Sequence, residues 1–213
     1  MFMKSKKNLL EQLKNMPNFD RDTVYQLGSK MGLKKTTLSV YISRFLKSRE
    51  IIKLKRDMYI SADFFDKNKG DVPYRFYLAN ILRAPSYVSM WSALDYYGLV
   101  TEAVYGISSV TPKVTRKFET KIGNFSYQSI NKDVFSDYVL VKGKPASSAD
   151  GFNFFIASPS KALFDLLYFK TNRFRSVDFR DIDALIESLR IDLLEMDETE
   201  RNNFNSMIKK YYE

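Results

Sequence analysis

Apolar residues recur at helical spacing in a segment near the N-terminus. Val24, Leu27 and Met31 fall on one side of a helix that would begin at Asp20 and end at Gly32. An Asp at the first position can accept hydrogen bonds from the free amides of the first turn, and Gly permits the backbone to leave the right-handed region. The pattern predicts a helix followed by a tight turn.

A second helix is predicted to start around residues 34–37. Its apolar stripe has the spacing i, i+3, i+4, i+7, i+8 and should face the core. The stripe consists of Leu38, Tyr41, Ile42, Phe45 and Leu46. The opposite side carries Lys35, Thr36, Ser39, Ser43 and Lys47, with Arg44 at its edge. Small polar groups let a helix backbone come close to DNA while long cations reach bases or phosphates, so this mixture favours a helix in a major groove.

Residues 51–60 then alternate with period two. The apolar positions 52, 54, 58 and 60 alternate with Lys53, Lys55 and Tyr59 around an Arg56-Asp57 turn, which predicts a short hairpin. A hairpin after two such helices is typical of a winged helix, whose wing contacts neighbouring phosphates. We therefore expect residues 1–65 to form a winged helix-turn-helix. An ordinary small α/β domain with solvated basic faces is the alternative.

The remaining pattern predicts a linker at residues 66–73, inside a turn-rich stretch from 61 to 73, and a mixed α/β domain at 74–213. Expected helices cover 74–84 and 87–99, and others start after Ser158-Pro159 and Asp178. Strand-like segments cover 104–111, 116–120, 124–130, 138–142 and 152–157, and a polar loop covers 143–151. The expected fold class is α+β.

Composition narrows the chemistry. The 213 residues include neither Cys nor His, which excludes disulfides, structural zinc, a cysteine nucleophile and a histidine base. We expect no catalytic residue, no metal and no cofactor. No apolar run approaches the roughly 18 residues of a membrane span, and the N-terminus has no apolar signal-peptide core. The expected location is the cytoplasm, without a membrane partner.

Positive charge is concentrated in the first 65 residues. Of the formal net charge of +9, these residues carry +8, because they contain 14 Lys and Arg but only six Asp and Glu. Such asymmetry indicates that these residues bind a polyanion, and with the helix and hairpin pattern we expect that polyanion to be double-stranded DNA. The candidate base-reading residues are Lys35, Thr36, Ser39 and Ser43. The candidate phosphate contacts are Lys34, Arg44, Lys47, Lys53, Lys55 and Arg56. Lys113, Arg116, Lys117 and Lys121 form either a second nucleic-acid surface or a charged hairpin that faces solvent.

Three segments of the second domain carry a family resemblance when taken in order. They are YVSMWSALDYYGL at 87–99, VTPKVTRKFETKIGNFSY at 110–127 and IASPSKALFDLL at 156–167. Following a winged helix, this order resembles the AbiEi family of antitoxins from bacterial abortive-infection toxin–antitoxin systems, over about residues 10–190. Ser160 stands where the family pattern usually has Glu, and Asp57 stands at a wing turn where Gly is usual.

The resemblance implies a dual role. The N-terminal domain would bind inverted repeats upstream of its own operon and repress it, and the C-terminal domain would counteract a nucleotidyltransferase-type toxin. The family is usually classed as acting without a stable antitoxin–toxin complex, so direct binding is not implied. Inverted repeats require two copies on DNA, which is compatible with a monomer in solution that pairs on the operator.

Two other functions have some support in the sequence. Glu119-Thr120-Lys121 has the acid–x–Lys spacing of Mg²⁺-dependent nucleases, with Asp95 and Glu102 as the nearest second acids, although a cross-strand ion pair is the ordinary explanation. A ligand-responsive transcription regulator would instead need a small-molecule cavity. Its aromatic lining could come from Tyr74, Phe76, Tyr77, Trp91, Tyr96, Tyr97, Phe125 and Tyr127, which are otherwise core residues.

Overall fold

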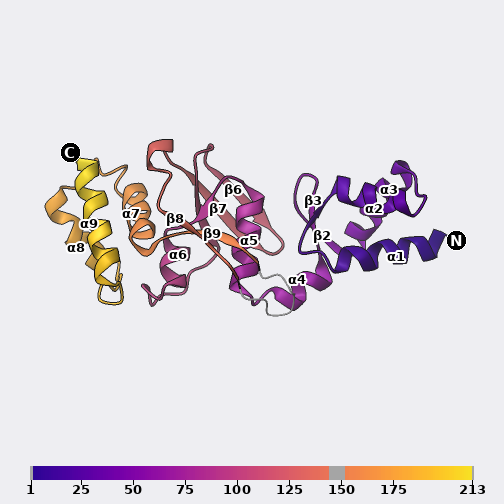
Figure 1. The fold of residues 1–213 in the computed structure, drawn as a ribbon, viewed down its shortest axis with the longest axis horizontal. Coiled ribbons are helices and arrows are strands. Elements are labelled where there is room, and N and C mark those ends of the chain that lie inside the picture. The colour runs from indigo at the N-terminus through magenta and orange to yellow at the C-terminus, as the bar shows by residue number, and fades with distance from the viewer. Residues whose placement is uncertain (1, 144–151, 213) are drawn as a thin grey trace. The chain divides into compact units, whose positions relative to one another are not determined.

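The computed structural model describes residues 2–143 and 152–212, so the predicted loop at 143–151 lies almost wholly outside the described residues. The chain divides into two compact units (Figure 1). The first is Met1–Val72 with Thr120–Ile122, and the second is Pro73–Glu119 with Gly123–Glu213. Each contains helices and strands, which confirms the predicted mixed α and β composition.

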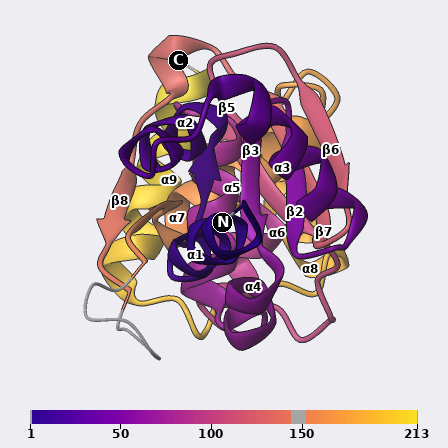
Figure 2. The same ribbon diagram turned by 90° about the vertical axis from the view of Figure 1, so that its right-hand side faces the viewer.

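The N-terminal unit is built from helices around a small antiparallel sheet. Its elements are α1 (Phe2–Lys14), β1 (Phe19–Asp20), α2 (Arg21–Lys30), α3 (Lys35–Lys47), β2 (Ile51–Lys55), β3 (Met58–Ser61) and α4 (Ala62–Asn68). The sheet order is β1-β3-β2. Figure 2 shows β2 and β3 side by side, and α3 packs against β2. The two helices and the hairpin predicted at residues 20–61 are confirmed.

Local signals set the ends of α2. The Asp20 carboxylate accepts from the Thr23 backbone N–H at 2.7 Å, and this bond lowers the pKa of Asp20. After α2 the backbone turns at Gly32, where φ is +72°. Gly28 lets α2 approach α3 closely, because a Cβ at this position would clash with the side chain of Leu38.

The predicted apolar stripe of α3 faces the core of this unit. Leu38, Tyr41, Ile42 and Phe45 are buried together with Leu9 and Leu13 of α1, Phe19, Val24, Ile51 and Tyr59. Leu46, at the end of the stripe, is only half-buried. The opposite side of α3 is therefore the accessible one.

Two details differ from the predicted pattern. Tyr59, expected on the solvent side of the hairpin, is 2% exposed and stacks on Phe19 at 6.0 Å between ring centroids. A bulge at Leu54 shifts the register between Lys53 and Lys55, which breaks the period-two alternation.

Residues 61–73 are less turn-like than predicted. Ser61 caps α4, and only residues 69–71 separate α4 from the next helix.

The C-terminal unit has a six-stranded mixed sheet with the order β6-β7-β5-β4-β9-β8. Its strands are β4 (Tyr87–Val88), β5 (Ile107–Thr111), β6 (Arg116–Thr120), β7 (Gly123–Ser129), β8 (Tyr138–Val141) and β9 (Phe154–Ala157). Its helices are α5 (Val72–Leu82), α6 (Trp91–Tyr96), α7 (Pro159–Lys170), α8 (Ile182–Ser188) and α9 (Glu198–Tyr212), with 3-10 turns η1 (Lys132–Val134) and η2 (Phe179–Asp181). Among the described residues, no helix is both long and apolar enough for a bilayer span.

The helix predicted at 87–99 is wrong over its first part. Tyr87 and Val88 form β4, which pairs with β5 on one side and β9 on the other, and both side chains are fully buried. The helix α6 begins only at Trp91, after Met90 with a φ of +56°. A short apolar run buried on both faces has no period that distinguishes a strand from a helix.

A buried ion pair holds α7 against the sheet. Lys161 Nζ lies 2.8 Å from Asp165 Oδ1 and donates to the Val134 carbonyl at 2.8 Å. The Asp165 Oδ2 atom accepts from Ser89 Oγ at 2.7 Å and from Tyr87 OH at 3.1 Å. Burial raises the pKa of the Asp165 carboxyl, and Lys161 with the two hydroxyls opposes that rise.

Candidate nucleic-acid interface

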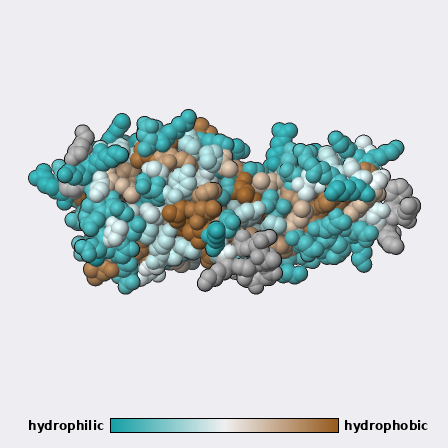
Figure 3. Space-filling view, in the orientation of Figure 1, coloured by the Kyte–Doolittle hydropathy of each residue, from teal (hydrophilic) through white to brown (hydrophobic). Residues whose placement is uncertain are grey.

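The accessible side of α3 carries the predicted DNA-contacting residues. Lys34, Lys35, Thr36, Ser43, Arg44 and Lys47 are exposed, and Ser39 is half-buried. The buried stripe on the other side of the helix fixes the direction in which these side chains project. Six of these seven residues thus lie on α3, and Lys34 directly precedes the helix. Figure 3 shows that hydrophilic residues cover most of the visible surface of the N-terminal unit.

Two hydroxyls on this face already have partners within the unit. Ser39 Oγ lies 2.9 Å from Tyr25 OH, which links α3 to α2. Ser43 Oγ donates to the Ser39 backbone carbonyl at 3.1 Å. The Lys35 ammonium lies 5.8 Å from the centroid of the Tyr25 ring, within the range of a cation–π contact. Tyr25, which the sequence analysis did not single out, therefore positions two of the four candidate base-reading residues.

Val40 is a second residue that the sequence analysis missed. It is 47% exposed and follows Thr36 by about one helical turn, on the accessible side of α3. The sequence does contain a sign of this residue, because Val40 is an apolar residue on the polar side of the predicted helix, where core packing does not require one. An exposed aliphatic group in the major groove can contact the methyl group of thymine.

The hairpin presents its cations unequally. Lys53 is exposed, Arg56 has a side chain that is 94% exposed, and Lys55 is half-buried. Asp57 has a φ of +57°, a conformation that Asp adopts more readily than most residues. Its carboxylate lies 3.0 Å from Arg21 Nε and 3.6 Å from Arg56 Nε. Arg21 is thus a further cation beside the turn of the hairpin.

The four basic residues proposed as a second surface do not share one environment. The Lys113 ammonium donates to the Ala84 carbonyl at 2.6 Å, so it has a structural partner. Arg116 and Lys117 are neighbours on β6 and point to opposite faces of the sheet. Arg116 stacks over the Phe118 ring at 5.0 Å, whereas Lys117 lines a pocket. Lys121 is exposed in the turn after β6.

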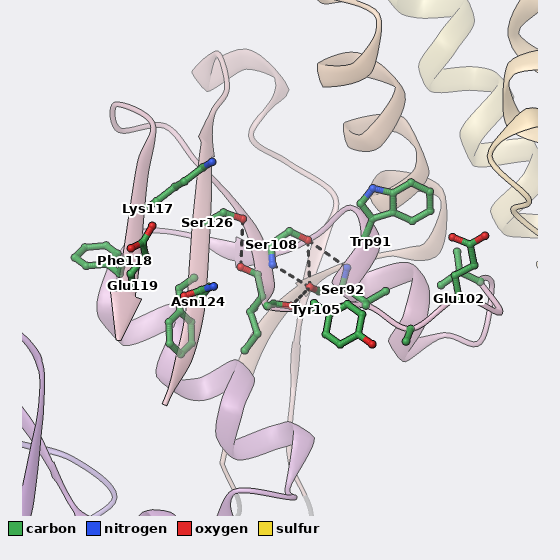
Figure 4. A pocket seen from close by; sticks show the side chains of 16 residues that line it. Trp91, Ser92, Glu102, Tyr105, Ser108, Lys117, Phe118, Glu119, Asn124 and Ser126 are labelled. Carbon is green, nitrogen blue, oxygen red and sulfur yellow. Dashed lines mark hydrogen bonds between the residues drawn. The ribbon is translucent and has the colours of Figure 1, made fainter. Parts of the chain in front are cut away.

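That pocket is a cavity of about 570 Å³ in the C-terminal unit (Figure 4). Of the eight aromatic residues proposed as a lining, only Trp91 and Phe125 line it. Tyr74 and Tyr127 belong instead to the buried core, and burial raises the pKa of both.

The candidate nuclease acids are distributed around and outside this pocket. Glu102 and Glu119 line it, while Asp95 is exposed on α6. Arg190 Nη1 lies 3.4 Å from a Glu102 oxygen. Within residues 2–143 and 152–212, no three acidic side chains gather in a group that could hold a metal ion.

The sequence matches no model of a protein family, and a search of curated proteins finds no match either. The residues of α3, of the hairpin and of the pocket are therefore the basis for a functional proposal.

Proposed function

We propose that this chain is a DNA-binding repressor and antitoxin. In this proposal the N-terminal unit acts as a winged helix-turn-helix, with α3 as the recognition helix and the β2–β3 hairpin as the wing. The C-terminal unit counteracts a nucleotidyltransferase-type toxin encoded with it. The chain would bind inverted repeats in its own promoter, two copies at a time.

One observation supports DNA binding most directly: the accessible side of α3 is cationic and hydroxyl-rich, and it has no acidic residue. The cations Lys35, Arg44 and Lys47 extend from it, with the smaller Thr36 and Ser43 between them. Such a side allows close approach to base edges while cations neutralise the flanking phosphates. The hairpin supplies Lys53 and Arg56 as further phosphate contacts.

The antitoxin role rests on the resemblance of three segments to the AbiEi family. Two of them meet in one buried network, because Tyr87 and Ser89 of the first segment donate to Asp165 of the third. This network joins the first and third segments within the C-terminal unit. It does not by itself specify a toxin, so the test of this role is genetic.

Salt-dependent binding tests the DNA proposal. Fluorescence anisotropy of the full chain with a labelled duplex from its own promoter should give a specific complex. If about five cations meet phosphates, log K should fall against log[salt] with a slope of roughly −4 to −5. A duplex of equal length and scrambled sequence is the control. Equal affinity for both duplexes, or affinity that does not respond to salt, would refute the proposal.

Growth rescue tests the antitoxin proposal. The chain should restore growth to cells that express a neighbouring nucleotidyltransferase gene. A variant with Lys35, Arg44 and Lys47 all changed to Ala should lose promoter binding and still rescue, because rescue is assigned to the C-terminal unit. Loss of rescue in a folded variant of this kind would contradict the division of roles.

A ligand-responsive regulator is the second candidate, and the pocket in the C-terminal unit favours it. Its volume is in the range of small-molecule sites, and its lining mixes aromatic rings with polar groups. A metabolite that raises Tm and changes promoter affinity would support this candidate over a simple antitoxin.

A further inference from the structure

We propose that the pocket of the C-terminal unit binds a nucleotide. The site consists of Trp91, Tyr105, Lys117, Glu119 and Asn124 around a floor of serine side chains. This assignment does not depend on DNA binding by α3. It names the ligand class that a ligand-responsive regulator requires.

The floor of the pocket is fixed before any ligand arrives. The Ser92 backbone N–H donates to Ser108 Oγ at 3.2 Å, and the Ser108 backbone N–H donates to Ser92 Oγ at 2.9 Å. Ser108 Oγ also donates to the Ser89 carbonyl at 2.7 Å. Figure 4 shows Ser92 and Ser108 between the strands that carry Lys117 and Asn124 and the side that carries Trp91 and Tyr105.

The same hydrogen bonds hold a strained residue. Met90 has φ +56° and ψ −138°, a backbone conformation that residues other than Gly rarely adopt. Met90 immediately precedes Trp91, so the strained residue sets where the indole ring enters the pocket wall. Strain of this kind persists only where the surroundings impose it, and it is concentrated at functional sites.

Two aromatic rings are available for a planar ligand. Tyr105 is 94% exposed, and Trp91 is partly exposed at the pocket wall. Neither ring is needed to fill the core, in contrast to the buried tyrosines of this unit. Exposed rings beside a cavity can stack on nucleobases, because every base presents a flat π surface.

The polar groups of the site match the other parts of a nucleotide. The side chains of Lys117, Glu119 and Asn124 make no hydrogen bond or ion pair with another described residue, so their donors and acceptors are available. An amide can pair with a base edge, a carboxylate can accept from ribose hydroxyls, and an ammonium can bind phosphate. All three come from β6 and from the start of β7.

Other ligand classes fit these residues less well. A purely apolar metabolite would desolvate the serine floor, Glu119 and Lys117 without replacing their hydrogen bonds to water. A simple anion would use only Lys117 and would leave the rings of Trp91 and Tyr105 without a partner. A nucleotide has a flat ring, hydroxyls and an anionic group, and it therefore uses both the aromatic side and the charged side.

Trp91 is the one tryptophan of the chain, so its fluorescence reports this site directly. Titration of the full chain with each of the four ribonucleoside monophosphates should quench the Trp91 emission to saturation with at least one of them. The matching nucleoside should quench with about tenfold lower affinity, because it lacks the phosphate that Lys117 binds. No saturable quenching by any monophosphate, or equal competition by inorganic phosphate alone, would overturn the proposal.

Single substitutions distinguish the contacts of Lys117 and Asn124 from non-specific binding of the anion to surface cations. Lys117→Ala should weaken the monophosphate about tenfold and leave the nucleoside unchanged, whereas Asn124→Ala should weaken both. Lys132→Ala, which removes an exposed cation of the same unit outside the pocket, should change neither affinity. If Lys132→Ala weakens the monophosphate as much as Lys117→Ala does, the binding is non-specific and the assignment is wrong.

The nucleotide could be a free metabolite or one residue of a single-stranded nucleic acid. Titration with a dinucleotide distinguishes these two sources. Binding at least as tight as that of the monophosphate identifies a residue of a single-stranded nucleic acid, and weaker binding identifies a free nucleotide. Promoter binding is measured separately by anisotropy, so failure of the pocket and failure of the DNA proposal are distinguishable.

Discussion

The ammonium of Lys161 lies 2.8 Å from the carboxylate of Asp165, one helical turn along α7, and the two side chains are only 1% and 0% exposed. Two charges so deeply buried are tolerated because each has further hydrogen bonds. The Val134 carbonyl accepts from the Lys161 ammonium, and Ser89 and Tyr87 donate to the Asp165 carboxylate. The pair therefore links α7, β4 and η1, which are distant in sequence.

Removing one partner of this ion pair should strongly destabilise the folded chain. Asp165→Ala leaves a buried ammonium without its counter-charge, and we expect the free energy of unfolding to fall by about 3–5 kcal/mol. The double variant Lys161→Met with Asp165→Leu should recover much of that loss, because it removes both charges. Urea unfolding measures both values. Lys170→Ala, an exposed cation on the same helix, is the control, and a loss for Asp165→Ala no larger than for this control would contradict the interpretation.

Base-reading and phosphate-binding residues should behave differently on DNA. Thr36→Ala should weaken binding to the promoter duplex by about 1–3 kcal/mol and scarcely change binding to random duplex. Lys53→Ala should weaken both about equally and make the salt slope shallower by about one unit. Anisotropy at several salt concentrations measures both. If the two variants lose affinity in the same pattern, the assignment of roles is wrong.

Val40 should contact a thymine methyl group. Replacing that thymine by uracil removes only the methyl group, and we expect a loss of about 0.8 kcal/mol for the unaltered chain. The same replacement should cost Val40→Ala much less, because the aliphatic partner is already missing. Uracil is placed at each thymine of the promoter site in turn. Should no single position show this coupling, Val40 does not read DNA in this way.

Stability should fall above about pH 10. Burial, with a smaller contribution from Tyr96, raises the pKa of Tyr97 to about 12, and burial raises the pKa of Tyr87 and Tyr127 as well. Unfolded tyrosines ionise near pH 10, so above that pH the folded chain binds more protons than the unfolded chain. The free energy of unfolding then decreases with rising pH until the folded-state pKa is passed.

Denaturant unfolding at about pH 9, 10 and 11 measures this slope. Tyr127→Phe should make it shallower, since one buried ionisable group is gone. Tyr105→Phe, at an exposed position, should leave it unchanged. A slope that is flat above pH 10 for the unaltered chain would show that the buried tyrosines ionise without unfolding.

The sequence predicted the N-terminal elements well because their signals are local. Asp20 caps the helix that its position predicted, and the apolar stripe of α3 is buried from Leu38 to Phe45. Tyr59 was misplaced because β3 is the central strand of its sheet, where the neighbouring residues Tyr59 and Ile60 are both buried, and a period-two pattern assumes that one face is exposed. Tyr87 and Val88 were assigned to a helix because their two residues carry no strand pattern of their own. They form a strand through their pairing with β5 and β9, which the local sequence does not show.

The candidate site shows the same division. The exposed cations and hydroxyls of α3 follow from helical periodicity, so they were predictable. The Tyr25–Ser39 contact was not, because it joins two helices through a turn. The pocket residues Trp91 and Lys117 lie on α6 and β6, and only the sheet topology brings them to one cavity.

The bond from Ser43 Oγ to the Ser39 carbonyl limits what Ser43 can recognise. A hydroxyl has a single proton, and here that proton is already shared with the helix backbone, which leaves only lone pairs directed outward. Guanine and thymine present acceptors in the major groove and would repel them, whereas the amino groups of cytosine and adenine would donate to them. When α3 docks as proposed, the nucleotide opposite Ser43 is therefore restricted to cytosine or adenine.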